Sequence, residues 1–167
     1  KGLQSSDLLT ALSVYDKLKK MDADDKVWAA LGLVDRFFLL AFTLGRKDMV
    51  HPWLYARCRE VEKNPDDHLD LWARGHYKST IITYAGTIQA ILLNPEITIG
   101  IFSHTRPIAK SFLRQIKREL EGSEKLKQLY PDTCWVNEKR EAPKWSEDDG
   151  IVVRRESNPK EATVEAW

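Results

Sequence analysis

The first third of the chain carries hydrophobic positions at helical spacing. In residues 7–20 they recur every three or four positions, which predicts an amphipathic helix. The apolar stretch 27–44 follows several aspartates and ends at Gly45, so we expect a buried core helix over residues 26–44 with a glycine stop. A shorter helix is predicted from Pro52 to Glu62. Residues 1–66 are therefore predicted to form an N-terminal helical region.

From residue 67 the pattern changes to short apolar runs that alternate with helical ones. Residues 69–73 and 97–103 read as buried strands, the second because it is β-branched and almost continuously apolar. Helical patterns follow each of them, over 79–93 and 107–121, and residues 151–155 and 163–167 also read as strands. The order strand, loop, helix, strand, helix predicts an α/β fold with a parallel sheet and right-handed crossovers.

Composition narrows the class of protein. With 167 residues, 43% hydrophobic residues and a formal net charge of +1, the chain matches an ordinary globular protein and not a polycationic nucleic-acid coat. Its two cysteines and four histidines have no disulfide-framework or metal-ligand spacing, so we expect a reducing, intracellular compartment. Asp35 and Arg36 in the middle of the longest apolar stretch argue against a membrane span, and the N-terminus has no signal-peptide pattern.

Residues 73–80, which read Ala-Arg-Gly-His-Tyr-Lys-Ser-Thr, form a polar loop between a predicted strand and a predicted helix. Such a loop directs backbone amides and the positive end of the helix dipole at one point, which favours phosphate. Lys78 can then reach phosphate oxygens, and the Ser79 hydroxyl is placed to ligate Mg²⁺. The alternative is a plain strand-to-helix turn with a solvated Lys78 and Ser79 as an N-cap.

The loop departs from the usual Walker A signature, G-x-x-x-x-G-K-[ST]. Trp72 and Tyr77 stand where that signature has glycine, and Gly75 is the loop's only glycine. Arg74 and Lys78 nevertheless flank one helix N-terminus, where two cations oppose the helix dipole unless an anion joins them. That arrangement favours an anion-binding role.

The string WARGHYKSTI resembles the P-loop of phage terminase large subunits, the ATP-driven motors that package viral DNA. In that family the loop often reads Arg-Gly-His-x-Lys-[Ser/Thr] after an apolar strand and lacks the usual glycines. The segments GRKDMVHPWLYARCREVE, IGIFSHTRPIAKSFLRQIKRELE and NPKEATVEAW also resemble the family's segments before the P-loop, after it and ahead of its Walker B strand. The resemblance covers roughly residues 40–167.

The resemblance implies a P-loop NTPase-type parallel sheet over residues 67–167, incomplete because it is truncated before the Walker B strand. It implies ATP and Mg²⁺ as cofactors, with Lys78 as the Walker A lysine and Arg74 stabilising charge on the γ-phosphate. Ser79 would be the Mg²⁺ ligand. The implied nucleotide-binding residues are Arg74, Gly75, His76, Tyr77, Lys78, Ser79 and Thr80. Because tyrosine tolerates a positive φ badly, we expect the loop to be wider or differently bent at Tyr77.

The family also implies biological partners: double-stranded DNA, a portal protein, a small terminase subunit and a homo-oligomeric ring, in the cytoplasm of an infected bacterial cell. Phosphoryl transfer to water further needs a Mg²⁺-organising aspartate after an apolar strand and a carboxylate that positions water. No run of four apolar residues followed by Asp-[Asp/Glu] occurs in the sequence. We therefore expect an ATPase that acts as part of a longer protein carrying the nuclease, with this portion inactive alone.

A stripe of cations on the predicted helix 107–121 and its approach is the candidate DNA contact. It consists of Arg106, Lys110, Arg114 and Lys117, spaced by four, four and three residues. A solvated helix face is the alternative, because Glu119, Glu121 and Glu124 follow closely. Two other functions stay open for the whole chain, namely another P-loop NTPase such as a helicase-like remodeller, or a non-catalytic interaction module.

Overall fold

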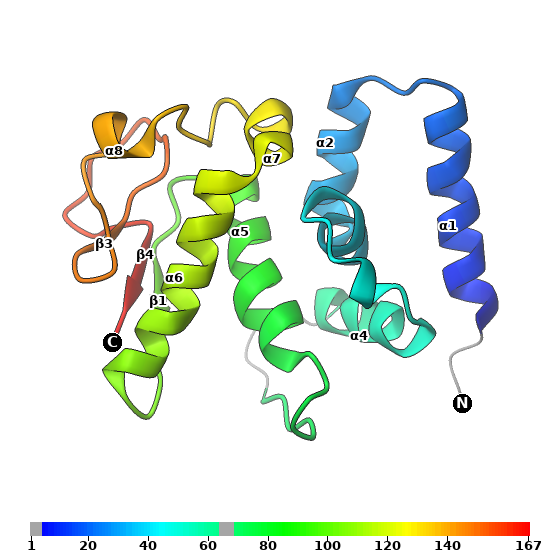
Figure 1. Cartoon of the computed structure of the whole chain (residues 1–167), viewed down its shortest axis with the longest axis horizontal. Coiled ribbons are helices and arrows are strands. Elements are labelled where there is room, and N and C mark those ends of the chain that lie inside the picture. Colours follow the sequence, from blue (N-terminus) through cyan, green and yellow to red (C-terminus); the bar gives the residue numbers. More distant parts are fainter. Residues whose placement is uncertain (1–4, 64–68) are drawn as a thin grey trace. The chain divides into compact units, whose positions relative to one another are not determined.

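The computed structural model describes residues 5–63 and 69–167, and the chain divides into two units, Lys1–Ile81 and Ile82–Trp167 (Figure 1). The predicted boundary between residues 66 and 67 lies outside the described residues. Helices and a small sheet together confirm a mixed α/β composition. Within the described ranges, no helix is both long and apolar enough to cross a membrane.

The first unit is helical, as the sequence predicts. Its elements are α1 (Ser5–Lys20), α2 (Asp25–Val34), α3 (Arg36–Phe38), the π-helical turn η1 (Leu39–Thr43), the 3₁₀ turn η2 (Lys47–Met49) and α4 (Pro52–Lys63). Asp24 caps α2, and Gly45 follows η1 with a φ of +67°. The helical run therefore ends in the left-handed conformation that glycine adopts without strain.

The helix predicted over residues 26–44 is not continuous, because it breaks at Asp35. This residue has extended backbone angles (φ −128°, ψ 97°), and its carboxylate accepts a 2.8 Å hydrogen bond from the amide of Phe38. A short carboxylate side chain competes with the helix for backbone amides, so it ends one helix and caps the next.

Aromatic rings form much of the core of the first unit. Phe37 and Phe38 are fully or almost fully buried, as are the neighbouring Leu39 and Leu40. Phe38 stacks on Trp28 at a centroid distance of 5.6 Å and meets the edge of Tyr15 at 5.1 Å. The second half of the apolar stretch, around residues 37–44, is thus the buried centre of the helical unit. In α2, by contrast, Gly32 is the one buried residue and Val34 is 71% exposed, so the predicted core helix is buried only in part.

Residues 69–73 do not form the predicted strand. They run without regular secondary structure, and Leu69 and Leu71 are 81% and 82% exposed. A β-strand is stabilised by pairing with a neighbour and by packing of one face, and no described strand pairs with this segment. The apolar run therefore lacks the partners that would turn its strand propensity into a strand.

The second unit contains helices and a four-stranded sheet. Its elements are the π-helical segment η3 (Thr80–Gly86), which begins at the end of the first unit, α5 (Thr87–Leu93), β1 (Ile99–Ile101), α6 (Arg106–Gly122), α7 (Glu124–Leu129), α8 (Glu138–Glu141), β2 (Trp145–Ser146), β3 (Gly150–Ile151) and β4 (Val164–Ala166). The strand order is β1-β4-β3-β2.

The sheet is mixed and not all parallel as predicted. β1 pairs with β4 in parallel, with Ile101 opposite Ala166, whereas β2–β3 and β3–β4 are antiparallel. The antiparallel part arises because the polar run around residues 146–150 makes a tight hairpin. Gly150 (φ +85°) is required there, since a Cβ atom would lie 2.6 Å from the carbonyl oxygen of Val164.

The strand predicted over residues 97–103 exists, but it is shorter and only partly buried. Ile101 is 7% exposed, whereas the next residue, Phe102, is 77% exposed. Successive side chains of a strand point to opposite faces, so β1 has one covered face in the described structure. The prediction that this strand is buried on both faces is therefore wrong.

Helix α6 confirms the predicted helix 107–121 and packs on β1 and β4. Its buried positions are Ala109, Leu113, Ile116 and Leu120, whereas Ile108 is 44% exposed. The buried face of α6 is therefore built from these four residues, and Ile108 lies at its edge. The η3–α5 helix runs alongside α6, and the Tyr84 hydroxyl donates a 2.7 Å hydrogen bond to Glu119 (Figure 1).

Candidate functional site

The loop predicted to bind phosphate connects the irregular segment 69–73 to a helix. That helix starts at Lys78, and its first backbone bond runs from the amide of Ile81 to the carbonyl oxygen of Tyr77 (2.9 Å). Lys78 therefore stands at the N-terminus of the helix, where the sequence pattern places it. Amides in a first helical turn have no partner within the helix, so they are available to an external acceptor.

Two residues of the loop adopt left-handed backbone angles. Gly75 has a φ of +81° and Tyr77 a φ of +59°. The expectation that the loop would be wider or differently bent at Tyr77, because tyrosine tolerates a positive φ badly, is wrong in that Tyr77 itself adopts a positive φ. A left-handed L-residue costs about 1–2 kcal/mol, so surrounding contacts must hold it.

Contacts from helix α4 and turn η2 hold the loop. The ring of Trp53 meets the edge of Trp72 at 5.8 Å and of His76 at 5.4 Å, while the guanidinium of Arg57 lies 5.7 Å from the centre of the Trp53 ring. The sequence pattern did not identify Trp53 and Arg57 as loop contacts. The one feature that could have indicated them is an aromatic residue and an arginine four positions apart on a predicted helix.

Asp48 is a second contact that the sequence did not reveal. Its carboxylate accepts hydrogen bonds from Arg46 at 3.0 and 2.8 Å. The arginine, and to a smaller extent a hydrogen bond from the Tyr77 hydroxyl, lower the pKa of this carboxyl. Asp48 thus stays ionised at neutral pH and holds the side chain of the strained loop tyrosine.

Lys78 does not point freely into solvent. It is half-buried, and its Nζ donates a 3.3 Å hydrogen bond to the backbone carbonyl oxygen of Asp70. The ammonium therefore lies over the segment that precedes the loop and is satisfied by an uncharged acceptor. An anionic acceptor within reach would make a stronger, charge-assisted bond.

The remaining predicted site residues are accessible to a ligand. Arg74, Gly75, His76 and Ser79 are exposed, and Tyr77 and Thr80 are half-buried. The Nδ1 atom of His76 lies 3.1 Å from the carbonyl oxygen of Arg74, which tightens the turn. The structure thus places residues 74–77 in a tight turn and residues 78–80 in the first turn of the helix that follows.

The four cations predicted to contact DNA all lie on α6, and each has an acidic or carbonyl partner within the second unit. Arg114 and Lys110 bind carboxylates of the β2–β3 hairpin, and Lys117 binds Glu121 at 2.7 Å. The four cations are therefore bound to other groups of the same chain. They form neither an unoccupied DNA-binding stripe nor a helix face that contacts only solvent.

The described residues offer no ready-made group of side-chain ligands for a metal ion. Within residues 5–63 and 69–167, no group of three or more His, Cys, Asp or Glu side chains is gathered as a metal site. A Mg²⁺ ion at Ser79 would therefore depend on ligands that a bound phosphate supplies.

No protein-family model, curated protein or solved structure matches this chain.

Proposed function

We propose that this chain is the ATP-binding portion of a phage terminase large subunit, a motor that hydrolyses ATP to move viral DNA into a procapsid. One observation supports nucleotide binding above the others: the left-handed residues Gly75 and Tyr77 stand immediately before a helix that begins at Lys78. This backbone form turns consecutive amides toward one point at a helix N-terminus. The string WARGHYKSTI adds the resemblance to the terminase loop.

The chemistry of the loop follows from its parts. Backbone amides from Gly75 to Ser79 donate hydrogen bonds to the phosphate oxygens, and Lys78 exchanges its bond to the Asp70 carbonyl for a bond to a charged oxygen. The Ser79 hydroxyl gives Mg²⁺ one ligand, and phosphate oxygens and water complete the shell. Exposed Arg74 is free to approach the γ-phosphate, where it stabilises developing charge.

Calorimetric titration of the chain with Mg²⁺ and ATP tests the binding step. Lys78→Ala removes a charged hydrogen bond to phosphate, so we expect affinity to fall by about 1.5–3 kcal/mol, a loss of roughly 10- to 100-fold. Lys19→Ala, which removes an exposed lysine of α1, is the matched control and leaves affinity unchanged. Equal affinities for the Lys78 and Lys19 variants would show that Lys78 is an incidental surface lysine and the chain a non-catalytic module.

A second experiment separates a packaging motor from another P-loop NTPase. The parent protein is mixed with procapsids, double-stranded DNA and ATP, and the DNA protected from added nuclease is measured. Protection that requires ATP and disappears in Lys78→Ala supports a terminase. ATP binding without protection would favour a helicase-like remodeller.

A further inference from the structure

The basic face of α6 is covered by an acidic hairpin of the same chain. β2 and β3 are joined by a tight turn that carries Glu147 and Asp148. Arg114 binds Glu147 in a two-pronged contact, with its Nε and Nη2 atoms 2.7 and 2.6 Å from the two carboxylate oxygens. Lys110 binds the Asp148 carboxylate, and Arg106 donates a 3.4 Å hydrogen bond to the Asp148 carbonyl oxygen.

This geometry imitates the binding of a phosphate backbone. Arg106, Lys110 and Arg114 follow each other at four-residue steps, which places them on one helix face at intervals of about 6 Å. Each meets an oxygen of the hairpin, and the two-pronged Arg114 contact is the fork that arginine also presents to phosphate. Such a row of cations positions a nucleic-acid backbone without reading its sequence.

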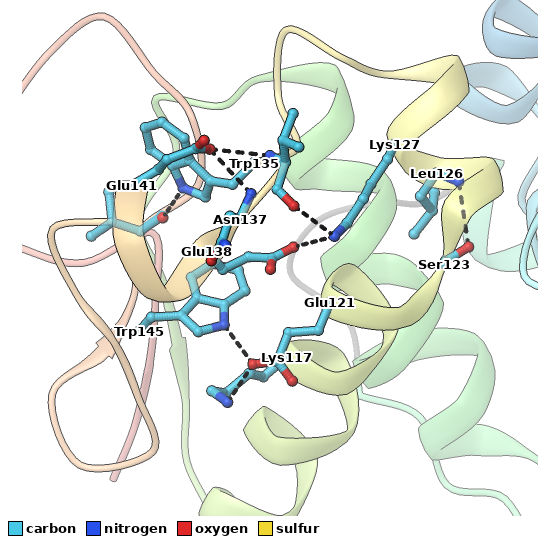
Figure 2. A network of polar contacts seen from close by, with 12 residues as sticks. Lys117, Glu121, Ser123, Leu126, Lys127, Trp135, Asn137, Glu138, Glu141 and Trp145 are labelled. Carbon is cyan, nitrogen blue, oxygen red and sulfur yellow. Dashed lines mark hydrogen bonds and ion pairs between the residues drawn. The ribbon is translucent and has the colours of Figure 1, made fainter.

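The tip of the hairpin is held by side chains at the surface, and its base by more buried contacts. The Asp148 side chain is 73% exposed, so solvent screens its ion pair with Lys110 and that pair adds little to stability. The two-pronged Arg114–Glu147 pair is the stronger contact of the tip, although its side chains are still 48% and 28% exposed. At the base, by contrast, the indole nitrogen of Trp145 donates a 2.8 Å hydrogen bond to Glu121, which also binds Lys117 (Figure 2). Ile151 in β3 is fully buried.

Space is available beside the tip. A cavity of about 590 Å³ is lined by Arg106, Asp148, Asp149 and Trp167 among others, so the turn is not packed against a solid core on that side. The guanidinium of Arg106 lies 5.9 Å from the centre of the Trp167 ring at the edge of this cavity. The turn can therefore shift while Trp145 and Ile151 keep the hairpin anchored.

We propose that the β2–β3 hairpin is an intramolecular mask that occupies a duplex-DNA-binding face of α6 with Glu147 and Asp148 in place of phosphates. Duplex DNA must displace the two carboxylates before Lys110 and Arg114 can bind its backbone. The mask lowers the affinity of α6 for any one DNA segment, so that a bound segment can be released. This proposal does not depend on nucleotide binding at residues 74–80, so failure of one leaves the other standing.

The test uses the full 167-residue chain and fluorescence anisotropy with a labelled 20-base-pair duplex. Glu147→Gln/Asp148→Asn keeps the shape of both side chains and removes their charge. We expect this variant to bind the duplex about tenfold more tightly than the native chain at low salt. The slope of log affinity against log salt should steepen by about 2, because two further cations reach phosphates.

Two controls separate unmasking from a general change in charge. Asp132→Asn/Glu156→Gln raises the net charge equally at exposed positions outside α6 and the β2–β3 hairpin, and it should leave affinity within about twofold of the native value. Adding Lys110→Gln/Arg114→Gln to the unmasked variant should abolish its gain. The proposal is overturned if the charge-matched control gains as much affinity, or if the gain survives loss of Lys110 and Arg114. Circular dichroism confirms folding, and Asp148→Asn alone, at the more exposed position, replaces the double variant if that variant unfolds.

Discussion

The hydroxyl of Tyr15 on α1 donates a 2.5 Å hydrogen bond to the buried carboxylate of Asp35, at the break between α2 and α3. The same carboxylate binds Arg59 of α4 at 2.5 Å and caps the amide of Phe38. One aspartate therefore ties three helical segments together. Burial of the phenol, together with its bond to Asp35, raises the pKa of Tyr15 far above its ordinary value, so the hydroxyl stays protonated and able to donate.

Replacing Tyr15 by phenylalanine should destabilise the first unit measurably. The substitution leaves a buried carboxylate with one donor fewer, and an unmade bond to a buried polar group costs about 1–3 kcal/mol. Urea unfolding followed by circular dichroism measures the loss. Tyr55→Phe is the matched control, because no hydrogen bond of its hydroxyl is recorded within the described structure, and its free energy of unfolding should change by less than about 0.5 kcal/mol. A loss as large in the control would show that the bond between Tyr15 and Asp35 is not the source of the effect.

The left-handed conformation of Gly75 predicts the outcome of a pair of glycine substitutions. A Cβ atom at Gly75 or Gly122 would meet nothing within 4 Å, so the two sites differ in backbone conformation and not in space. Gly75→Ala must hold alanine at a φ near +81° and should cost about 1–2 kcal/mol. Gly122→Ala, at the last residue of α6, should be neutral or stabilise by up to about 1 kcal/mol. Thermal unfolding of both variants decides the point, and equal effects would contradict the loop conformation.

The helices were largely predictable, because their signals are local. Spacing of apolar residues located α1, α4 and α6, and Gly45 marked the end of a helical run. The break at Asp35 was harder to foresee, since the same sequence reads as a continuous apolar helix. It forms because partners far along the chain, Tyr15 and Arg59, satisfy the carboxylate there.

The sheet and the loop contacts were less predictable, because they depend on distant partners. The run 69–73 has the composition of a strand, yet Leu69 and Leu71 stay exposed where no described strand pairs with them. At the candidate site, the position of Lys78 at a helix start was predictable, whereas the contacts of Trp53 and Asp48 with the loop were not. Those contacts join residues 20 or more positions apart.

The two buried cysteines predict a loss of stability at alkaline pH. Burial raises the pKa of Cys58 to about 12 and that of Cys134 to about 11, from an ordinary value of 9.0. The folded chain therefore keeps its thiol protons at pH values where the unfolded chain releases them. Stability from this source is fully present below pH 9 and is lost progressively as the pH rises from 9 through the folded-state pKa values of about 11 and 12.

Unfolding in urea at a series of pH values from 8 to 11 should show this loss, and Cys58→Ala should reduce its slope. The same burial predicts that neither thiol reacts with a disulfide reagent on the time scale of minutes in the native chain, whereas both react at once in urea. Fast reaction of either thiol without denaturant would show that the site opens readily.

The last prediction concerns catalysis: the chain alone should bind ATP with Mg²⁺ but release phosphate at a negligible rate. Lys78 and Ser79 can hold the triphosphate, yet hydrolysis also needs a carboxylate that organises the metal and another that positions water. The Asp48 carboxylate binds the loop through the Tyr77 hydroxyl, but it is already paired with Arg46. No metal-binding cluster of acidic side chains occurs in residues 5–63 or 69–167. Since positioning and charge stabilisation provide nearly all catalysis in phosphoryl transfer, a site without these groups should lose most of its rate.

A phosphate-release assay on the purified chain tests this prediction, with Lys78→Ala as the blank. Turnover of roughly 1 per second or faster that Lys78→Ala abolishes would require a catalytic carboxylate within the chain, and Asp48→Asn would then be the first substitution to make.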